Sequence, residues 1–154
     1  MTGLPPIGQW LHIDWMLVAA LAWLAVGAAG VLMLHRLALV AHLLFPLGGL
    51  AGLALFGLSL DALHGTPEVA VLPVGLPGLP FHLRLDSLSA YFLMVIGAAS
   101  AGISVFAAGY FRKGEGTPPG LLCLEYHVFL ASMAGGDLAD DAYAFMVMWE
   151  TMAL

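Results

Sequence analysis

The chain is organised as long, mostly apolar runs separated by short polar segments. The runs cover residues 15–34, 37–60, 87–111, 121–138 and 142–154, and the first three contain no Asp, Glu, Lys or Arg. About 20 apolar residues in an α-helix are enough to cross a hydrocarbon layer roughly 30 Å thick. The pattern therefore predicts an all-α polytopic membrane protein with four transmembrane helices and the first half of a fifth.

The first two runs are expected to form a helical hairpin. Only His35 and Arg36 separate them, and the second run contains a proline and several glycines. Small residues allow transmembrane helices to approach one another closely. Trp10 and Trp15 precede or begin the first run, at the place where an aromatic belt at the membrane interface is expected.

Residues 61–86 interrupt the helical pattern and are rich in Pro and Gly. In "FHLRLD", Phe81 and Leu83 alternate with His82 and Arg84, which is the period of a β-strand. The segment "EVAVL" can supply a partner strand, with "PGLP" near the turn. We expect a small external β-hairpin here, and the alternative is a coil that lies on the membrane surface.

The fourth run, residues 121–138, is the weakest of the predicted spans. It contains Glu125 and His127 and ends in "AGGD". Each glycine lowers helix propensity by about 1 kcal/mol relative to alanine. Asp137 lies near the end of the run, where a charge costs less than it does at the centre of the membrane.

The composition excludes several classes of protein. The chain is 62% hydrophobic and 9% charged, whereas about 25% of residues are charged in soluble domains. Four basic residues are too few for a nucleic-acid-binding surface. The single cysteine, Cys123, excludes an internal disulfide and a cysteine-ligated metal cluster within the chain. No Lys or Arg precedes the first run, so a cleavable signal peptide is not expected.

The basic residues predict an orientation in the cell (inner) membrane. Arg36 lies in the first connection, Arg112 and Lys113 lie in the third, and Arg84 lies in the second. Connections that face the cytoplasm are enriched in Lys and Arg. We therefore expect the first and third connections to be cytoplasmic, and the N-terminus and residues 61–86 to be outside.

The last run contains a single charged residue, Glu150. If its helix begins at Ala142, Glu150 lies about 12 Å along the axis, close to the middle of the hydrocarbon layer. A carboxylate at that depth is stable when it is neutral or when it is paired with a cation, and intramembrane acids are functional by default. The simpler interpretation is a polar residue that holds two helices together through a hydrogen bond.

A proton relay at Glu150 would need a cationic partner. The only lysine, Lys113, lies in a connection and cannot be that partner at mid-membrane depth. The run also stops about 20 Å along the helix axis, short of a full span. We therefore expect residues 1–154 to be the N-terminal part, a fragment, of one longer transporter domain.

The C-terminal half of the chain resembles a known family. The segments "LDSLSAYFLMVIGAASAGISVFAAGYFR", "YHVFLASM" and "DDAYAFMVMWETMAL" are similar to the antiporter-like, proton-conducting membrane subunits of complex I and its hydrogenase relatives. The likeness is greatest to the large membrane subunits of formate hydrogenlyase and hydrogenase-4. Its most specific part is the Trp-Glu-x-Met motif from Trp149 to Met152. Residues 1–84 match the family in layout rather than in motif.

The resemblance implies a function for Glu150. In the family, the glutamate of this motif lies in the fifth transmembrane helix, pairs with a lysine of a later helix and takes part in proton translocation. It implies a non-catalytic subunit of an oxidoreductase complex, whose partners are other membrane subunits and a peripheral redox arm. Family members have many more transmembrane helices than this chain. The segment "AGGDLADD" departs from the family, which is continuously apolar at Gly136 and Asp137.

Three other functions were weighed against proton translocation. Membrane haem is held by histidines on facing helices, and His35, His42 and His127 are the candidates. A structural membrane anchor without transport is the second alternative, and a sodium/proton antiporter subunit is the third. No nucleotide-binding loop, Ser-His-acid arrangement or metal-ligand spacing occurs in the sequence. We therefore expect this chain to hold no cofactor and no metal.

Overall fold

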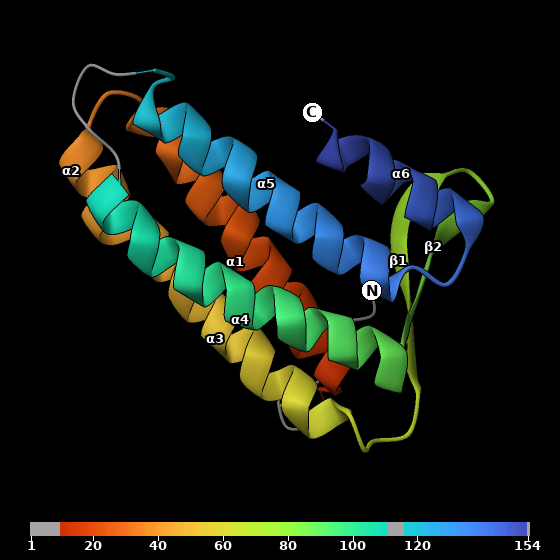
Figure 1. Ribbon diagram of the computed structural model, residues 1–154. Coiled ribbons are helices and arrows are strands. Elements are labelled where there is room, and N and C mark those ends of the chain that lie inside the picture. The colour runs from red at the N-terminus through yellow and green to blue at the C-terminus, as the bar shows by residue number, and fades with distance from the viewer. Residues whose placement is uncertain (1–9, 111–115, 154) are drawn as a thin grey trace.

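The computed structural model describes residues 10–110 and 116–153, and it consists mainly of long helices with one small sheet (Figure 1). In chain order the elements are α1 (His12–Leu32), α2 (Leu37–Leu39), the π-helical segment η2 (Val40–Leu44), α3 (Phe45–Ala62), β1 (Glu68–Leu76), β2 (Leu79–Leu85), α4 (Ser87–Tyr110), α5 (Pro119–Leu138) and α6 (Ala142–Met152). Helix α3 packs along α4, and α1 packs along α5 and α3. The short helix α6 lies beside α5.

Three helices in the described part of the chain are long and apolar enough to cross a membrane. They cover His12–Leu32, Leu37–Ala62 and Ser87–Ala107. These correspond to the first three spans that the hydrophobic pattern predicts, except that residue 111, the end of the third, lies outside the described residues. Helix α5 and the 11-residue helix α6 occur where further spans are expected. That either one crosses a membrane remains a prediction.

The segment between α3 and α4 contains a β-hairpin, so the prediction of strands is confirmed and the alternative of a coil is wrong. β1 and β2 pair antiparallel, with Ala70 opposite Leu83 and Leu72 opposite Phe81. Phe81 and Leu83 are buried against the helices, whereas Arg84 is exposed, as the alternation predicts. The register shifts between Leu72 and Gly75.

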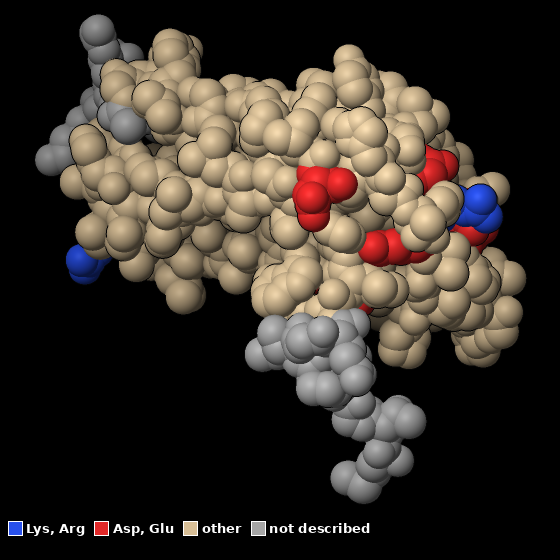
Figure 2. Space-filling view, turned by 90° about the horizontal axis from the view of Figure 1, so that it is seen from below, with Lys and Arg blue, Asp and Glu red and all other residues tan. Residues whose placement is uncertain are grey.

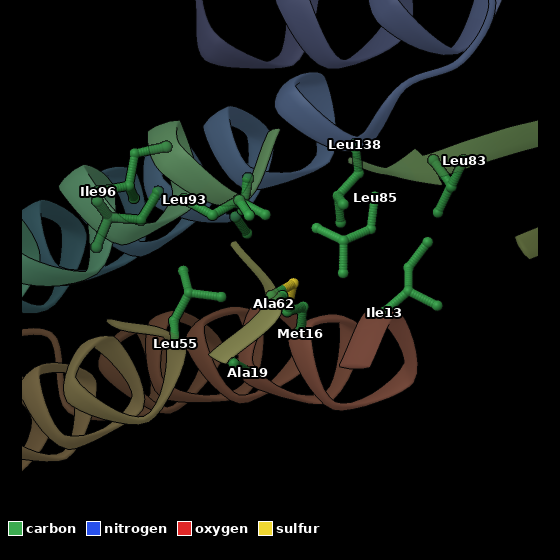
Figure 3. Close-up of a cluster of buried hydrophobic side chains, with 14 of the residues drawn as sticks. Ile13, Met16, Ala19, Leu55, Ala62, Leu83, Leu85, Leu93, Ile96 and Leu138 are labelled. Carbon is green, nitrogen blue, oxygen red and sulfur yellow. The ribbon is translucent and has the colours of Figure 1, made fainter. Parts of the chain in front are cut away.

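The hydrophobic core is largest at the hairpin end of the bundle. Figure 3 shows side chains from all four long helices and from β2 converging there, among them Ile13, Met16, Leu55, Leu85, Leu93 and Leu138. Because the buried face of β2 continues the core of the helices, the hairpin is packed onto the bundle. It therefore fixes the relative positions of the helix ends beside it.

Carboxylates cap two helices at this end. Asp86 accepts hydrogen bonds from the backbone N–H groups of Leu88 (3.0 Å) and Ser89 (2.9 Å) at the start of α4, as expected of a helix N-cap. The N–H of Ser89 in particular lowers the pKa of the Asp86 carboxyl below its usual value. Asp141 caps α6 in the same way, by accepting from the Ala144 N–H at 2.7 Å.

The double glycine in α5 is a packing feature, and the helix continues through it to Leu138. A Cβ atom on Gly135 would lie 2.7 Å from the sulfur of Met148 in α6, closer than a real Cβ contact. The absence of a side chain therefore lets α6 approach α5. This helix–helix contact offsets the low helix propensity of glycine.

The connections lie at two opposite ends of the bundle. At one end the Gly120 N–H donates to the Leu34 carbonyl oxygen at 3.1 Å, which joins the start of α5 to the end of α1. At the other end the Asp140 N–H donates to the His82 carbonyl oxygen at 2.9 Å, which joins the α5–α6 connection to the hairpin. Odd and even connections are thus on opposite sides, as alternating spans require.

Candidate functional site

Glu150, the predicted relay residue, lies near the end of α6, and its side chain is exposed. Among the residues that the structure describes, no hydrogen bond or ion pair reaches its carboxylate. Lys113 lies outside the described residues. The described chain therefore presents the carboxylate on an open helix face and does not bring a cation to it.

The start of α6 is fixed by charged contacts with the hairpin. Asp141 accepts from the ring Nδ1 of His82 at 3.1 Å, and the Arg84 guanidinium lies 2.8 Å from the carboxylate of Asp140. The Ala144 N–H is the main cause that lowers the pKa of Asp141, and His82 adds to it. These contacts orient α6 from its first turn, and the helix carries Glu150 away from the hairpin end along α5 (Figure 1).

A second charged cluster joins α1, α3 and β1. The ring of His12 lies between two carboxylates, with Nδ1 2.9 Å from Glu68 and Nε2 2.9 Å from Asp61. Glu68 also accepts the Ile13 N–H at 2.8 Å. A neutral imidazole has a single N–H group, so a doubly protonated ring is the form that donates to both carboxylates. The cluster holds the first strand against the ends of two long helices.

The interior of the bundle contains one imidazole, that of His127 in α5, which has 0% of its surface exposed. Its Nδ1 lies 2.7 Å from the Cys123 carbonyl oxygen, one turn earlier. A carbonyl oxygen only accepts, so Nδ1 carries the hydrogen and donates it. Among the described residues Nε2 has no hydrogen-bond partner. It abuts Gly48 of α3, where an added Cβ would collide with it.

Buried hydroxyl groups lie on the other side of α3, toward α4. Ser104 is buried against Gly49, and its Oγ has no hydrogen-bond partner among the described residues. Ser100 packs against Gly52 and donates to the Gly97 carbonyl oxygen at 2.9 Å. The glycines of α3 thus make room for polar side chains inside an otherwise apolar bundle.

The structure separates the three histidines that were considered as haem ligands. His35 and His42 are exposed, whereas His127 is buried between α1, α3 and α5. Because His127 is close to the start of its hydrophobic run, the sequence alone favours a position at the membrane interface. Its side chain is instead buried inside the bundle, with Gly27 of α1 and Phe45 and Gly48 of α3 against it. The sequence feature that could have indicated this burial is the glycine-rich stretch "PLGGLAG", because a helix face without side chains leaves room for the ring of a neighbouring helix.

Comparison with known proteins gives weak but extensive similarity. The chain is 29% identical over 143 residues to hydrogenase-4 component B of Escherichia coli, a match that covers 92% of this chain and 21% of that protein. It is also 29% identical over 107 residues to an uncharacterized protein found in two strains of Mycobacterium tuberculosis, covering 68% of this chain and 16% of that protein. No family model matches the chain. The chain spans about a fifth, or less, of the length of these relatives.

Proposed function

We propose that this chain is part of a membrane subunit of a hydrogenase-type complex and that the subunit translocates protons. The observation that carries the proposal is the similarity to hydrogenase-4 component B, which extends over 92% of the chain. The three helices that are long and apolar enough to cross a membrane support a location in the bilayer. The resemblance to complex I-type antiporter-like subunits is the reason to propose that the ion is a proton and that its movement is coupled to electron transfer in partner subunits.

Glu150 is the protonatable group of this proposal. It lies eight residues into α6, about 12 Å from the start of the helix, and its side chain is exposed on the described chain. A carboxylate in such a position can bind a proton or pair with a cation from a further helix. Its alternation between these two states would move one proton per cycle. The redox chemistry of the complex would take place in other subunits.

The test is the substitution Glu150→Gln in the full-length protein, assembled in its complex. We expect coupled proton movement to be abolished while assembly and electron transfer remain, because the amide keeps the shape but binds no proton. Proton uptake per electron transferred would be measured in inverted membrane vesicles with a pH-sensitive dye. Glu150→Asp retains a titratable group and should preserve part of the flux. Unchanged proton uptake in Glu150→Gln would refute the proposed role.

A matched control is Glu125→Gln, which removes another exposed carboxylate, from α5. It changes the net charge by the same amount as Glu150→Gln and leaves α6 intact. We expect its proton uptake per electron to equal that of the unmodified protein. The same vesicles, assayed with and without sodium and a sodium ionophore, distinguish proton translocation from sodium/proton antiport.

A further inference from the structure

The side chain of His127 is held in one defined chemical form. Nδ1–H donates to the Cys123 carbonyl oxygen at 2.7 Å, so the lone pair of the neutral ring is on Nε2. Neutral histidine in water prefers the other arrangement, with hydrogen on Nε2. The fold therefore selects the less common tautomer and leaves a basic nitrogen inside the bundle.

Within the described part of the chain, no hydrogen bond or ion pair reaches Nε2. The rings of Phe45 and Tyr126 lie beside the imidazole, Gly48 of α3 abuts Nε2, the Cys123 thiol lies 3.5 Å from Nδ1, and Gly27 of α1 faces the Cβ of His127. The ionisable groups among them are the phenol and the thiol. An apolar side chain of similar size would fill the same space without leaving a buried nitrogen unpaired, so packing alone does not account for an imidazole here.

The polypeptide beside Nε2 departs from a regular α-helix. Residues Val40–Leu44 form a π-helical turn, and Pro46, which lacks an N–H, follows within two residues. Single π-helical turns inside α-helices occur frequently at functional sites. The Trp23 indole N–H donates to the Gly48 carbonyl oxygen at 2.9 Å and holds this part of α3 against α1. The segment beside Nε2 thus contains a π-helical turn and a proline, and the Trp23 hydrogen bond holds it to α1.

Hydroxyl groups continue the polar interior from α5 to α4. The Tyr126 hydroxyl donates to the Ser100 carbonyl oxygen at 3.3 Å, and the buried Oγ of Ser104 lies one turn further along α4. Hydroxyl groups donate and accept at once and can therefore pass protons. The basic nitrogen of His127 and the hydroxyl groups of Ser100 and Ser104 thus pack against the same glycine-rich stretch of α3, residues 48–52.

We propose that His127 is a second proton-carrying residue of this membrane domain. Its Nε2 binds one proton during uptake and gives up one proton during release, while the Nδ1–H bond to the Cys123 carbonyl stays in place. The ring alternates between imidazole and imidazolium, and no other bond changes. The inference rests on the proposed function, and it adds an interior group, on α5, to the carboxylate of Glu150 on α6.

The first experiment tests the chemical form of the ring and does not depend on transport. The chain, labelled with ¹⁵N-histidine, is placed in lipid nanodiscs and its six histidines are observed by NMR. We expect one neutral ring to carry its hydrogen on Nδ1, and the resonance to disappear in His127→Gln. A His127 ring with its hydrogen on Nε2, or one that exchanges as freely as an exposed histidine, would overturn the proposal.

The second experiment measures transport by the full-length protein in its complex. We expect His127→Gln to lower proton uptake per electron by about tenfold or more, with electron transfer retained, and to change its pH dependence. Leu130→Ala is the control, since it removes buried volume from the same helix, three residues away, without touching a titratable group. It should lower the amount of assembled complex and leave protons per electron and the pH profile unchanged.

The outcomes separate this inference from the proposed function. If Glu150→Gln abolishes proton uptake and His127→Gln changes neither the ratio nor the pH profile, His127 has a structural role and the inference fails alone. If neither variant affects proton uptake, both the inference and the proposed function fail. If Leu130→Ala alters the pH profile as His127→Gln does, the effect comes from packing, and the inference is overturned.

Discussion

Gly48 is the residue on which the geometry of the His127 site depends most directly. A methyl group on Gly48 would collide with the imidazole, and the same residue's carbonyl oxygen binds the Trp23 indole. We predict that Gly48→Ala lowers the thermal stability of the chain in detergent, by about 1–3 kcal/mol, the usual cost of overpacking. Gly57→Ala is the matched control on α3, because it meets nothing within 4 Å. It should be neutral or slightly stabilising; equal stability of the two variants would contradict the prediction.

Glu68 gives the hairpin a dependence on pH. Burial acts to raise the pKa of its carboxyl, but the Ile13 N–H and the His12 ring more than offset this, so the pKa is lowered. A lowered pKa stabilises the fold above the unfolded value of 4.5, and this contribution is lost as the pH falls through the folded pKa. We predict that the protection of the β1 amides, relative to their intrinsic exchange rates at the same pH, decreases as the pH falls below about 4.5. Glu68→Gln should remove this pH dependence, and a hairpin that remains equally protected in acid would show the idea to be wrong.

At the residue level, the sequence pattern predicts a role for Glu150, which stays a prediction, and it does not indicate the burial of His127. A single acid in an apolar run is conspicuous because its cost in a membrane is local. The burial of His127 instead depends on two helices, α1 and α3, that are distant in sequence. The order of apolar and polar residues along the chain does not show which helices pack around His127. The role of Glu150 is still a prediction, since no described residue pairs with it.

The position of α6 depends on the cap at its first turn. Asp141 accepts both the Ala144 N–H and contacts from His82, so it joins the helix start to the hairpin. We predict that Asp141→Ala increases amide exchange in the first turn of α6 and, in the complex, lowers proton uptake by displacing Glu150. Asp141→Asn keeps an acceptor at the cap and should behave nearly as the parent. Identical exchange rates in the alanine and asparagine variants would argue against the cap.

At the element level, the sequence predicted best those helices and strands whose structure follows from their own pattern of apolar and polar residues. The alternation in "FHLRLD" predicted the hairpin because one face of β2 is buried and the other exposed. The uncharged runs predicted α1, the continuous stretch of α2, η2 and α3, and α4 within a few residues. The π-helical turn at Val40–Leu44 and the glycine contact between Gly135 and Met148 were not predictable, since both depend on how neighbouring helices pack.

At the scale of the whole molecule, charged side chains gather at the two ends of the bundle on the face shown in Figure 2, as expected if the bundle spans a membrane. Figure 2 shows charged groups gathered near the hairpin end of one face, a broad uncharged surface beside them, and basic atoms at the opposite end. The hairpin end contains the acids of both charged clusters and one basic residue, Arg84. Arg36 lies at the other end, beside the start of α5. On the face seen in Figure 2, an uncharged belt thus lies between two polar ends, which is the arrangement that a bilayer favours.

The positive-inside rule turns this distribution into a prediction about orientation. Arg36, Arg112 and Lys113 belong to the first and third connections, so that end should face the cytoplasm and the hairpin should face outward. Because the native Cys123 is buried, a Cys123→Ala background gives a clean test. In that background we expect Thr66→Cys to react with a membrane-impermeant maleimide in intact spheroplasts, and His35→Cys to react only after permeabilisation. The reverse labelling would invert the orientation and place the hairpin with its acid clusters in the cytoplasm. Labelling of both positions in intact cells would mean that the helices between them do not cross the membrane, which would remove the basis for placing Glu150 within it.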